Sequence, residues 1–222
     1  MQNTVNPIDS ATHSQPIISA IILAAGLSKR MGEANKLLLD FQNQPMVRTV
    51  VSIYMQSLIH EVIVVAGYQH EAIAQALSGC KVTVAVNPDF EQGMASSIGV
   101  GVRSAHPSAQ GYLIALGDMP MVQPRTIQQV CQVFAQRPGR SIVVPRYQGR
   151  RGHPVLFGCA FNQNLQNLRG DSGARRILVH HSLAVREVAV EDPGIHRDID
   201  SGREYQNLGR TFPSTGQTHT GW

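Results

Sequence analysis

The chain has 222 residues, enough for one domain with a full hydrophobic core but short for two. Its 42% hydrophobic and 15% charged residues are those of a globular protein, and no apolar run reaches the roughly 18 residues of a membrane span. A net charge of +4 with 5% aromatic residues, and no matching recognition motif, disfavours nucleic-acid binding. An anionic small-molecule substrate explains the scattered arginines near glycine turns at least as well as nucleic acid does.

The two ends of the chain indicate the bounds of its domain, and its cysteines indicate its compartment. Residues 1–15 are polar and lack the basic-then-apolar order of a secretion signal. Cys80, Cys131 and Cys159 are widely spaced without a C-x-x-C pair, which is typical of reduced thiols, so we expect a cytoplasmic protein. Residues 1–15 and 209–222 lack periodicity, and we expect both to be disordered around a single domain at 16–208.

Apolar strands alternate with helical patterns along the chain. Strands are predicted at residues 17–23, 62–66, 82–86, 112–116, 142–145, 155–157 and 184–190. Helices are predicted at 45–58, 71–77, 95–104 and 126–135, with shorter ones around 161–168 and 173–179. Continuous apolar strands separated by helices imply an α/β fold whose mostly parallel sheet is covered on both faces.

A small-residue loop with two cationic side chains follows the first strand. It runs Leu23-Ala24-Ala25-Gly26-Leu27-Ser28-Lys29-Arg30-Met31-Gly32, and Lys36 comes four residues later. Gly and Ala let backbone N–H groups approach phosphates closely, and Arg30 and Lys36 can neutralise phosphate charge. The loop is neither G-x-G-x-x-G nor a Walker loop. We predict a polyphosphate-binding loop in preference to an ordinary surface loop.

The segment Gly117-Asp118-Met119-Pro120 directly follows the fourth predicted strand. A carboxylate at a strand end suits a divalent cation, because Mg²⁺ takes oxygen ligands and commonly uses one or two carboxylates plus substrate phosphates. The alternative is an aspartate that caps the next helix. Pro124 indicates that this helix begins beyond Asp118, which favours the metal role.

The segment from Asn87 to Ser97 follows the third predicted strand and offers a candidate anion site. Gly93 relieves steric crowding, and Ser96 and Ser97 place hydroxyl and amide groups at a helix N-terminus. Capping of the helix by either serine explains the same residues equally well, and the two roles are compatible.

Three later segments carry further candidate residues for binding substrate or metal. Gly152-His153-Pro154 could place an imidazole against substrate, although His153 could equally be structural. The turn from Gly170 to Arg175 makes Arg175 a candidate clamp for an anionic acceptor. Asp198 and Asp200 share one face of an extended segment, because side-chain direction alternates, and either could be a second metal ligand. Solvated acids in a loop are the alternative.

In this order and spacing, over about residues 17–208, these segments resemble the molybdenum-cofactor nucleotidyltransferases. The loop at 23–36 is similar to their nucleotide-binding signature, and 117–120 to their metal motif. The resemblance is closest to the molybdenum cofactor (molybdopterin) cytidylyltransferase family, because guanylyltransferase relatives typically read Ala-Gly-Gly at 24–26. Segments 35–38, 92–97, 152–154 and 170–175 also follow the cytidylyl pattern. Residues 201–204 depart from it, reading Ser-Gly-Arg-Glu where Thr-Pro-Glu-Asp is usual.

The resemblance implies a three-layer, Rossmann-like α/β nucleotidyltransferase fold with a mostly parallel central sheet. It implies transfer of CMP from CTP to the terminal phosphate of molybdopterin-bound molybdenum cofactor, with Mg²⁺ as cofactor and pyrophosphate released. The implied catalytic residues are Arg30, Lys36 and Asp118, and the metal ligands are Asp118 and Asp200. The nucleotide-binding residues are Leu23, Ala24, Ala25, Gly26, Ser28, Arg30, Lys36, Gly67, Asn87, Gly93, Ser97 and Gly117. The acceptor-binding residues are Ser96, His153 and Arg175.

CTP and the molybdenum cofactor are the expected partners, with a transient contact to a molybdoenzyme or its chaperone, and neither nucleic acid nor a membrane. Two alternatives remain in the same class: transfer of GMP, and transfer to another phosphorylated acceptor such as a sugar phosphate. A non-catalytic nucleotide-binding module that delivers the cofactor is the alternative of a different class. Arg30, Lys36 and Asp118 argue against it, because a sensor needs the nucleotide pocket but not the metal carboxylate.

Overall fold

The structure is a computed structural model that describes residues 15–27, 35–171 and 173–199. The predicted disordered ends, 1–15 and 209–222, lie outside these residues except for Gln15. The strands are β1 (Ile18–Ala24), β2 (Glu61–Ala66), β3 (Thr83–Val86), β4 (Gly111–Leu116), β5 (Ile142–Tyr147), β6 (Arg150–Arg151), β7 (Val155–Gly158) and β8 (Val185–Ala189). The α-helices are α1 (Met46–Met55), α2 (His70–Ala76), α3 (Met94–Ser104), α4 (Pro124–Ala135), α5 (Asn162–Gln166) and α6 (Arg175–His180).

Short 3₁₀ helices connect several of these elements. They are η2 (Lys36–Leu38), η3 (Phe90–Gln92), η4 (Cys159–Phe161), η5 (Ser182–Ala184) and η6 (Pro193–His196). None of the helices in the described ranges is long and apolar enough to cross a membrane.

The strands form one sheet in the order β3-β2-β1-β4-β7-β5-β6, with β8 paired to β5. Strands β1 to β4 are mutually parallel where they pair, while β7 runs antiparallel to both β4 and β5. Strand β5 therefore points the same way as β4, and β8 is parallel to β5. The prediction of an α/β fold with a mostly parallel sheet is confirmed.

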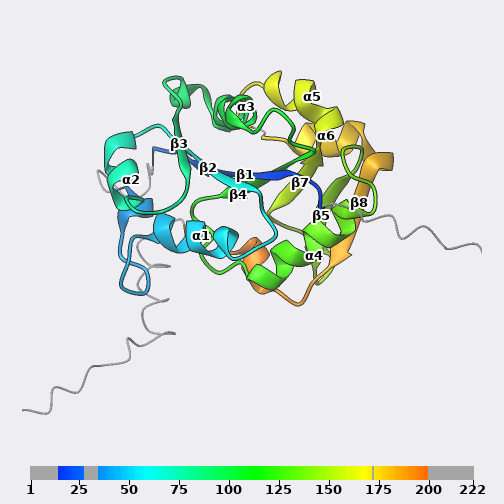
Figure 1. Cartoon of the computed structure of the whole chain (residues 1–222), viewed down its shortest axis with the longest axis horizontal. Helices are drawn as coiled ribbons and strands as arrows, with labels where there is room; N and C mark the ends of the chain where they lie inside the picture. The colour runs from blue at the N-terminus through cyan, green and yellow to red at the C-terminus, as the bar shows by residue number, and fades with distance from the viewer. Residues whose placement is uncertain (1–14, 28–34, 172, 200–222) are drawn as a thin grey trace, which may run out of the picture.

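Helices cover both faces of the sheet and make three layers (Figure 1). Helices α3, α5 and α6 lie on one face, where Ile98 packs with Ile21 of β1. Helices α1, α2 and α4 lie on the other, where Val50 packs with Ile22. Adjacent residues of one strand enter opposite cores because side-chain direction alternates, so a strand covered on both faces must be apolar throughout.

The predicted elements agree with the structure to within a few residues, apart from the small β6. Strand β6 closes a hairpin with β5 in which Tyr147 pairs with Arg150. The two residues between them, Gln148 and Gly149, have φ angles of 46° and 80°. Positive φ at both central positions is what a tight two-residue hairpin requires, and glycine adopts it without strain. A hairpin this short leaves no alternating apolar run for the sequence pattern to reveal.

Candidate active site

The sheet has a switch point between β1 and β4. The chain leaves β1 toward β2 and β3 on one side, and then returns to β4 on the other side of β1. In open α/β sheets, ligands bind in the crevice at the carboxyl ends of the strands at such a point. Here β1 ends at Ala24, followed by the predicted phosphate loop, and β4 ends at Leu116, followed by Gly117 and Asp118. Two predicted site segments therefore meet at one place.

Lys36 and Asp118 form an ion pair at this switch point. Lys36 Nζ lies 2.6 Å from Asp118 Oδ2, and the two side chains are 14% and 19% exposed. The 3₁₀ helix η2 positions the lysine, because Asn35 Oδ1 accepts from the Leu37 amide at 3.1 Å and the Leu37 side chain is buried. Residues 82 apart in sequence, both singled out by the sequence analysis, are thus in direct contact.

Gly117 allows β4 to end close against β1. Its amide donates to the Leu23 carbonyl at 2.9 Å. A methyl group added to Gly117 would lie 2.9 Å from that same carbonyl oxygen and 3.4 Å from Leu37 Cδ1. Only glycine fits here, and the turn that presents Asp118 is therefore tied directly to the start of the phosphate loop.

One oxygen of Asp118 remains without a hydrogen-bond partner. Among the described residues, Asp118 Oδ1 and His153 Nδ1 are the buried side-chain atoms with no partner. The aspartate is not a helix cap, because the N-cap of α4 is Gln123. In the described ranges, no group of three or more His, Cys, Asp or Glu side chains is placed to hold a metal ion. The orphaned carboxylate oxygen fits a divalent cation that takes one protein carboxylate and completes its shell with substrate phosphates and water.

His153 lies near Asp118, just before β7. Val155 of β7 pairs with Ile114 of β4, so His153 comes close to the end of β4. Burial lowers the pKa of His153 below its usual value, while the Asp118 charge and a backbone hydrogen bond to Ile114 have smaller, opposing effects. The imidazole is therefore neutral at neutral pH. The influence of the Asp118 charge on this pKa indicates that the two side chains are close to one another.

The predicted nucleotide-binding residues lie at the ends of β1, β2 and β3. Leu23 and Ala24 close β1, and Ala25 is buried while Gly26 is exposed. Gly67 follows β2 in close contact with this loop, since a Cβ there would lie 2.9 Å from Ala25 Cβ. A methyl at Gly26 would meet none of the described residues within 4 Å, so the loop is open toward them on that side.

Asn87 organises the segment that follows β3. Its side-chain amide donates to Ser96 Oγ at 2.8 Å and Ser97 Oγ at 2.9 Å, and its oxygen accepts from the Asp89 amide. Ser96 Oγ also contacts the carbonyls of Asp89 and Gly93, at 3.0 and 2.8 Å. Asn87 and Ser97 are buried, so these contacts hold the loop in shape.

The N-terminus of α3 is covered by a distant segment of the same chain. Its N-cap is Gly93, so neither serine caps it. Asp171 Oδ1 accepts from the Met94 amide at 3.2 Å, and the Gly170 carbonyl accepts from the Ala95 amide at 3.1 Å. Gly93 has φ of 102° and no room for a side chain against Asp171. The first amides of the predicted anion site are thus bonded to the chain's own groups.

The remaining predicted site residues are less closely connected to the Lys36–Asp118 pair. Arg175 is exposed on α6, and Asp198 is exposed just before the buried Ile199. The Ile199 amide donates to the Asp118 carbonyl at 2.9 Å, so this late segment does pass the site. Three predicted residues, Ser28, Arg30 and Asp200, lie outside the described residues.

Asp192 is a buried acid that the sequence analysis missed. Its Oδ2 accepts from the Gln123 amide at 2.9 Å and from Thr126 Oγ1 at 2.7 Å, and its Oδ1 accepts from the Gly194 amide at 2.8 Å. It joins the start of α4 to the turn at η6. The available signal was the triplet Asp192-Pro193-Gly194, in which aspartate commonly bonds the backbone two residues on.

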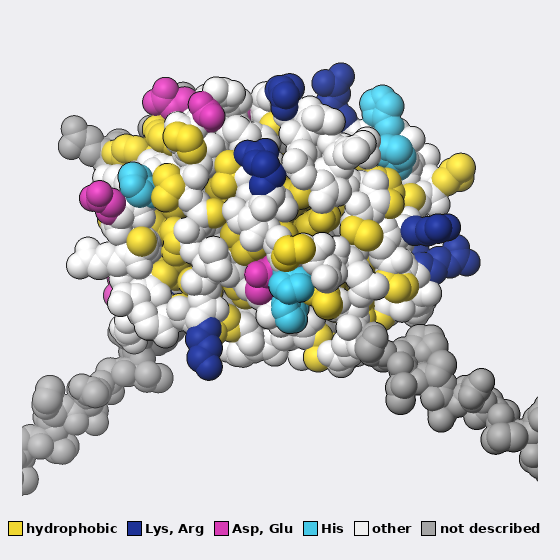
Figure 2. All heavy atoms as spheres, turned by 45° about the horizontal axis from the view of Figure 1, so that its top comes forward, with side chains coloured by type: hydrophobic (Ala, Val, Ile, Leu, Met, Phe, Trp, Pro, Cys, Tyr) yellow, Lys and Arg dark blue, Asp and Glu magenta, His cyan; other side chains and the backbone are white. Residues whose placement is uncertain are grey.

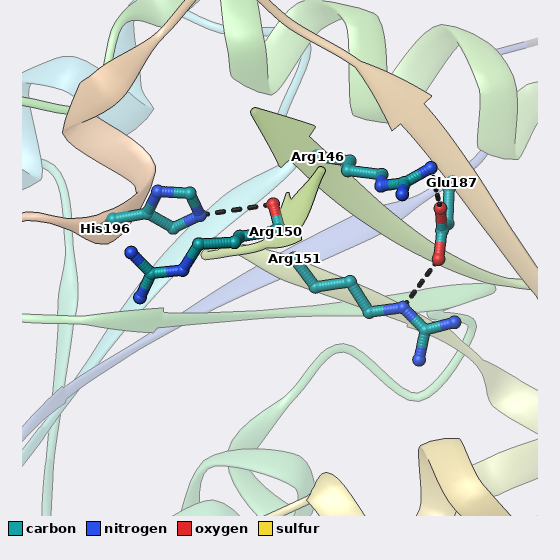
Figure 3. Close-up of polar contacts among 5 residues, drawn as sticks. All are labelled: Arg146, Arg150, Arg151, Glu187 and His196. Atoms are coloured by element: carbon teal, nitrogen blue, oxygen red, sulfur yellow. Dashed lines mark hydrogen bonds and ion pairs between the residues drawn. The ribbon is translucent and has the colours of Figure 1, made fainter. Parts of the chain in front are cut away.

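Several arginines lie on the β5–β6 hairpin, where β6 is the last strand of the sheet. Arg146 and Arg151 both point toward Glu187, at 3.3 and 2.7 Å, while Arg150 points away from it (Figure 3). His196 Nε2 lies 3.1 Å from the Arg150 carbonyl and donates to it. These pairs are half exposed and contribute less than about 1 kcal/mol each. On the face in Figure 2, Lys and Arg side chains lie in separate groups rather than in a continuous stripe.

Comparison with known proteins identifies the class and the family. A three-layer α/β domain with a mostly parallel sheet has the architecture of the Rossmann-like nucleotidyltransferases, and a nucleotidyl transferase from Methanothermobacter superposes on it with a TM-score of 0.75. The model of the MobA-like NTP transferase domain matches residues 20–185, and the chain belongs to this family. Nucleotidyl transfer is the activity that this membership supports.

Individual relatives carry different names. The chain is 31% identical to molybdenum cofactor cytidylyltransferase of Escherichia coli K12, over 85% of this chain and 93% of that protein. It is 28% identical to nicotine blue oxidoreductase of Paenarthrobacter nicotinovorans, over 87% and 97%. A solved manganese complex of Rv0371c from Mycobacterium tuberculosis H37Rv superposes with a TM-score of 0.74 at 28% identity, covering 88% of this chain and 100% of that one. Divalent metal use thus occurs among related structures.

Proposed function

We propose that this protein transfers CMP from CTP to the terminal phosphate of molybdopterin-bound molybdenum cofactor and releases pyrophosphate. The observation that carries the proposal is the contact between Lys36 and Asp118 at the switch point, 2.6 Å apart. A cation and a metal-binding carboxylate beside a phosphate loop are the groups that transfer at a phosphorus centre needs. The identity to the cytidylyltransferase of Escherichia coli supports CTP and this acceptor.

In the proposed reaction an oxygen of the acceptor phosphate attacks the α-phosphorus of CTP. The new O–P bond forms as the bond from the α-phosphorus to the bridging oxygen breaks, and pyrophosphate leaves with that electron pair. A phosphate monoester is already ionised at neutral pH, so the attacking group needs no strong base. Catalysis then depends on alignment of the two substrates and on neutralising their charge.

The chain's own residues supply both the alignment of the two substrates and the neutralisation of their charge. Lys36 stabilises negative charge on the triphosphate and on the leaving pyrophosphate, and backbone amides around Ala25 and Gly26 bind phosphate oxygens. We assign Arg30 the same electrostatic role. Asp118 would hold the divalent cation through its orphaned Oδ1, and we assign Asp200 as a second ligand. When bound, Mg²⁺ or a similar ion neutralises phosphate charge and holds the substrates in register.

Substrate selection is divided between the two sides of the switch point. We assign the cytosine base to the surface formed by Ala24, Ala25 and Gly67, where close contact with Phe90 leaves little room for a larger purine. We assign the acceptor to the side of His153, with Ser96 and Arg175. The product then passes to a molybdoenzyme or its chaperone by transient contact. The three free cysteines suit a reducing cytoplasm.

A pyrophosphate-release assay tests this function. The full chain is mixed with a divalent cation, molybdenum-loaded pterin and each of the four nucleoside triphosphates in turn. We expect release with CTP, and a rate about a hundredfold lower in Lys36→Gln, because one preorganised charge contributes roughly 3 kcal/mol to transition-state stabilisation.

Two outcomes would change the assignment. Faster release with GTP would make the protein a guanylyltransferase, and release with a sugar phosphate but not the pterin would change the acceptor. Absence of pyrophosphate with every combination, together with thermal stabilisation by CTP, would favour a non-catalytic nucleotide-binding module, since a ligand stabilises the state that it binds.

A further inference from the structure

Two buried acceptor atoms face the end of β4 without hydrogen-bond partners. They are Asp118 Oδ1 and His153 Nδ1, and in the described ranges no other buried side-chain atom is left in this state. Buried polar atoms in native proteins are nearly always paired, so each unpaired one calls for an explanation. The Asp118 charge acts on the His153 ring, so the two groups are close to one another. Two lone pairs that no donor of the described chain satisfies suit a shared cation.

His153 has a ring nitrogen, Nδ1, with no hydrogen-bond partner among the described residues. Burial lowers the pKa of the ring, so the imidazole is neutral at neutral pH and carries a single N–H. In the tautomer that holds this proton on Nε2, Nδ1 presents a bare lone pair. A neutral imidazole nitrogen with a bare lone pair is the form in which histidine binds a metal ion.

Both groups are held in place by the backbone and by charge. The His153 amide donates to the Ile195 carbonyl at 3.0 Å, and Gly152 packs so closely on Ile195 that a side chain would not fit. Lys36 holds Asp118 Oδ2 at 2.6 Å, which leaves Oδ1 as the available oxygen. The carboxylate and the imidazole are therefore preorganised before a ligand arrives.

We propose that His153 Nδ1 is a direct ligand of the divalent cation that Asp118 Oδ1 binds, making this a mixed carboxylate–imidazole site. An imidazole nitrogen suits first-row transition metals, whereas Mg²⁺ and Ca²⁺ prefer oxygen. The site should therefore bind Mn²⁺ more tightly than Mg²⁺. The inference rests on the proposed function only for the location of the metal, and it needs neither CTP nor the molybdenum cofactor as substrate.

Pulsed electron paramagnetic resonance of bound Mn²⁺ tests this without any substrate. The full chain is stripped with EDTA, loaded with Mn²⁺ and examined for coupling to a directly bound ¹⁴N nucleus. We expect this coupling in the wild type, and its replacement by the ¹⁵N pattern in protein made with ¹⁵N-histidine. Absence of nitrogen coupling at saturating Mn²⁺, or a signal unchanged by the isotope, would overturn the proposal.

Two variants assign the nitrogen to a residue. We expect His153→Gln to abolish the coupling and to weaken Mn²⁺ binding at least about tenfold, because removing even a group that only orients a ligand costs that much. His196→Gln is the matched control. His196 lies on η6 and donates to the Arg150 carbonyl, so this variant should retain both the nitrogen coupling and the affinity for Mn²⁺. Coupling that persists in folded His153→Gln would refute the assignment. The nucleotide assay fails or succeeds independently of these results.

Discussion

Asp118 and Asp192 are two acids at the same end of the sheet with opposite surroundings. Asp192 is 1% exposed, and each of its oxygens accepts from a backbone amide, with Thr126 added on one side. Asp118 has one oxygen on Lys36 and one with no partner within the described chain. Both carboxylates are fixed in position, but only Asp118 has an oxygen without any hydrogen-bond partner among the described residues.

The comparison shows how a structural acid differs from a candidate functional one. A fully bonded carboxylate contributes to folding, because its removal would leave several donors unsatisfied. A carboxylate with a buried, unpaired oxygen is unfavourable in the protein alone and becomes favourable only when a ligand supplies the missing partner. Hydrogen-bond satisfaction therefore distinguishes the two roles better than burial does.

Substituting asparagine for Asp192 should produce the largest loss of stability. Backbone amides of Gln123 and Gly194 approach its two oxygens from opposite sides, so the asparagine NH₂ must face one of them whichever way it turns. We expect Asp192→Asn to lower the free energy of unfolding by about 3 kcal/mol. Urea denaturation measures this, and a change below about 1 kcal/mol would mean that the bonds contribute little.

The same substitution at Asp118 should affect activity rather than stability. Asparagine still accepts a hydrogen bond from Lys36 and places no donor against a donor. We expect Asp118→Asn to change the free energy of unfolding by about 1 kcal/mol at most and to slow nucleotidyl transfer at least about a hundredfold. Equal losses of stability in the two asparagine variants would remove the distinction between the two acids.

Two glycines extend the comparison to the backbone. An alanine at Gly117 would press on the Leu23 carbonyl, whereas the methyl group of one at Gly26 meets no atom of the described chain within 4 Å. We expect Gly117→Ala to destabilise the fold by about 2 kcal/mol, as overpacking does. Gly26→Ala should keep wild-type stability and raise the KM for nucleotide. Thermal unfolding and steady-state kinetics, measured on both variants, separate the packing role from the binding role.

The smallest expected effect is on the pH dependence of stability. Burial lowers the pKa of His153 in the folded protein below its usual value of 6.5. At a pH between the folded-state pKa and 6.5, the unfolded chain therefore binds a proton at this histidine and the folded chain does not. The metal-free protein should therefore lose stability as pH falls below about 6.5. The His153→Gln variant should lose less stability over this range. His70 is exposed, so His70→Gln serves as a control. Thermal unfolding from pH 8 to 5.5 measures the difference.

Local sequence patterns predicted most of the fold, because parallel strands covered on both faces must be apolar throughout. Ile21 and Ile22 show this, since they enter opposite cores. Strand β6 was missed because two residues carry no periodicity. The contact between Lys36 and Asp118 could be anticipated, because the loop that follows β1 leads to Lys36 and Asp118 closely follows β4, and the carboxyl ends of these neighbouring parallel strands lie at the same edge of the sheet.

Other contacts between distant segments could not be predicted. Nothing in the sequence near Asp171 shows that its carboxylate caps α3, since that bond joins residues 77 apart. The same applies to Asp192, whose partners in α4 lie 66 and 69 positions away. The state of His153 was also inaccessible, because an unpaired ring nitrogen is a property of packing in three dimensions rather than of the Gly-His-Pro sequence.

The hydrogen bond from the Ile199 amide to the Asp118 carbonyl has a consequence for synthesis of the chain. Strands β1 and β4 can pair as soon as residue 116 has been made, but the turn at Asp118 acquires this neighbour only when residue 199 has left the ribosome. A nascent or truncated chain that stops before this point would have a sheet but an unfinished turn at the switch point. Completion of the site is therefore one of the last events in its biogenesis.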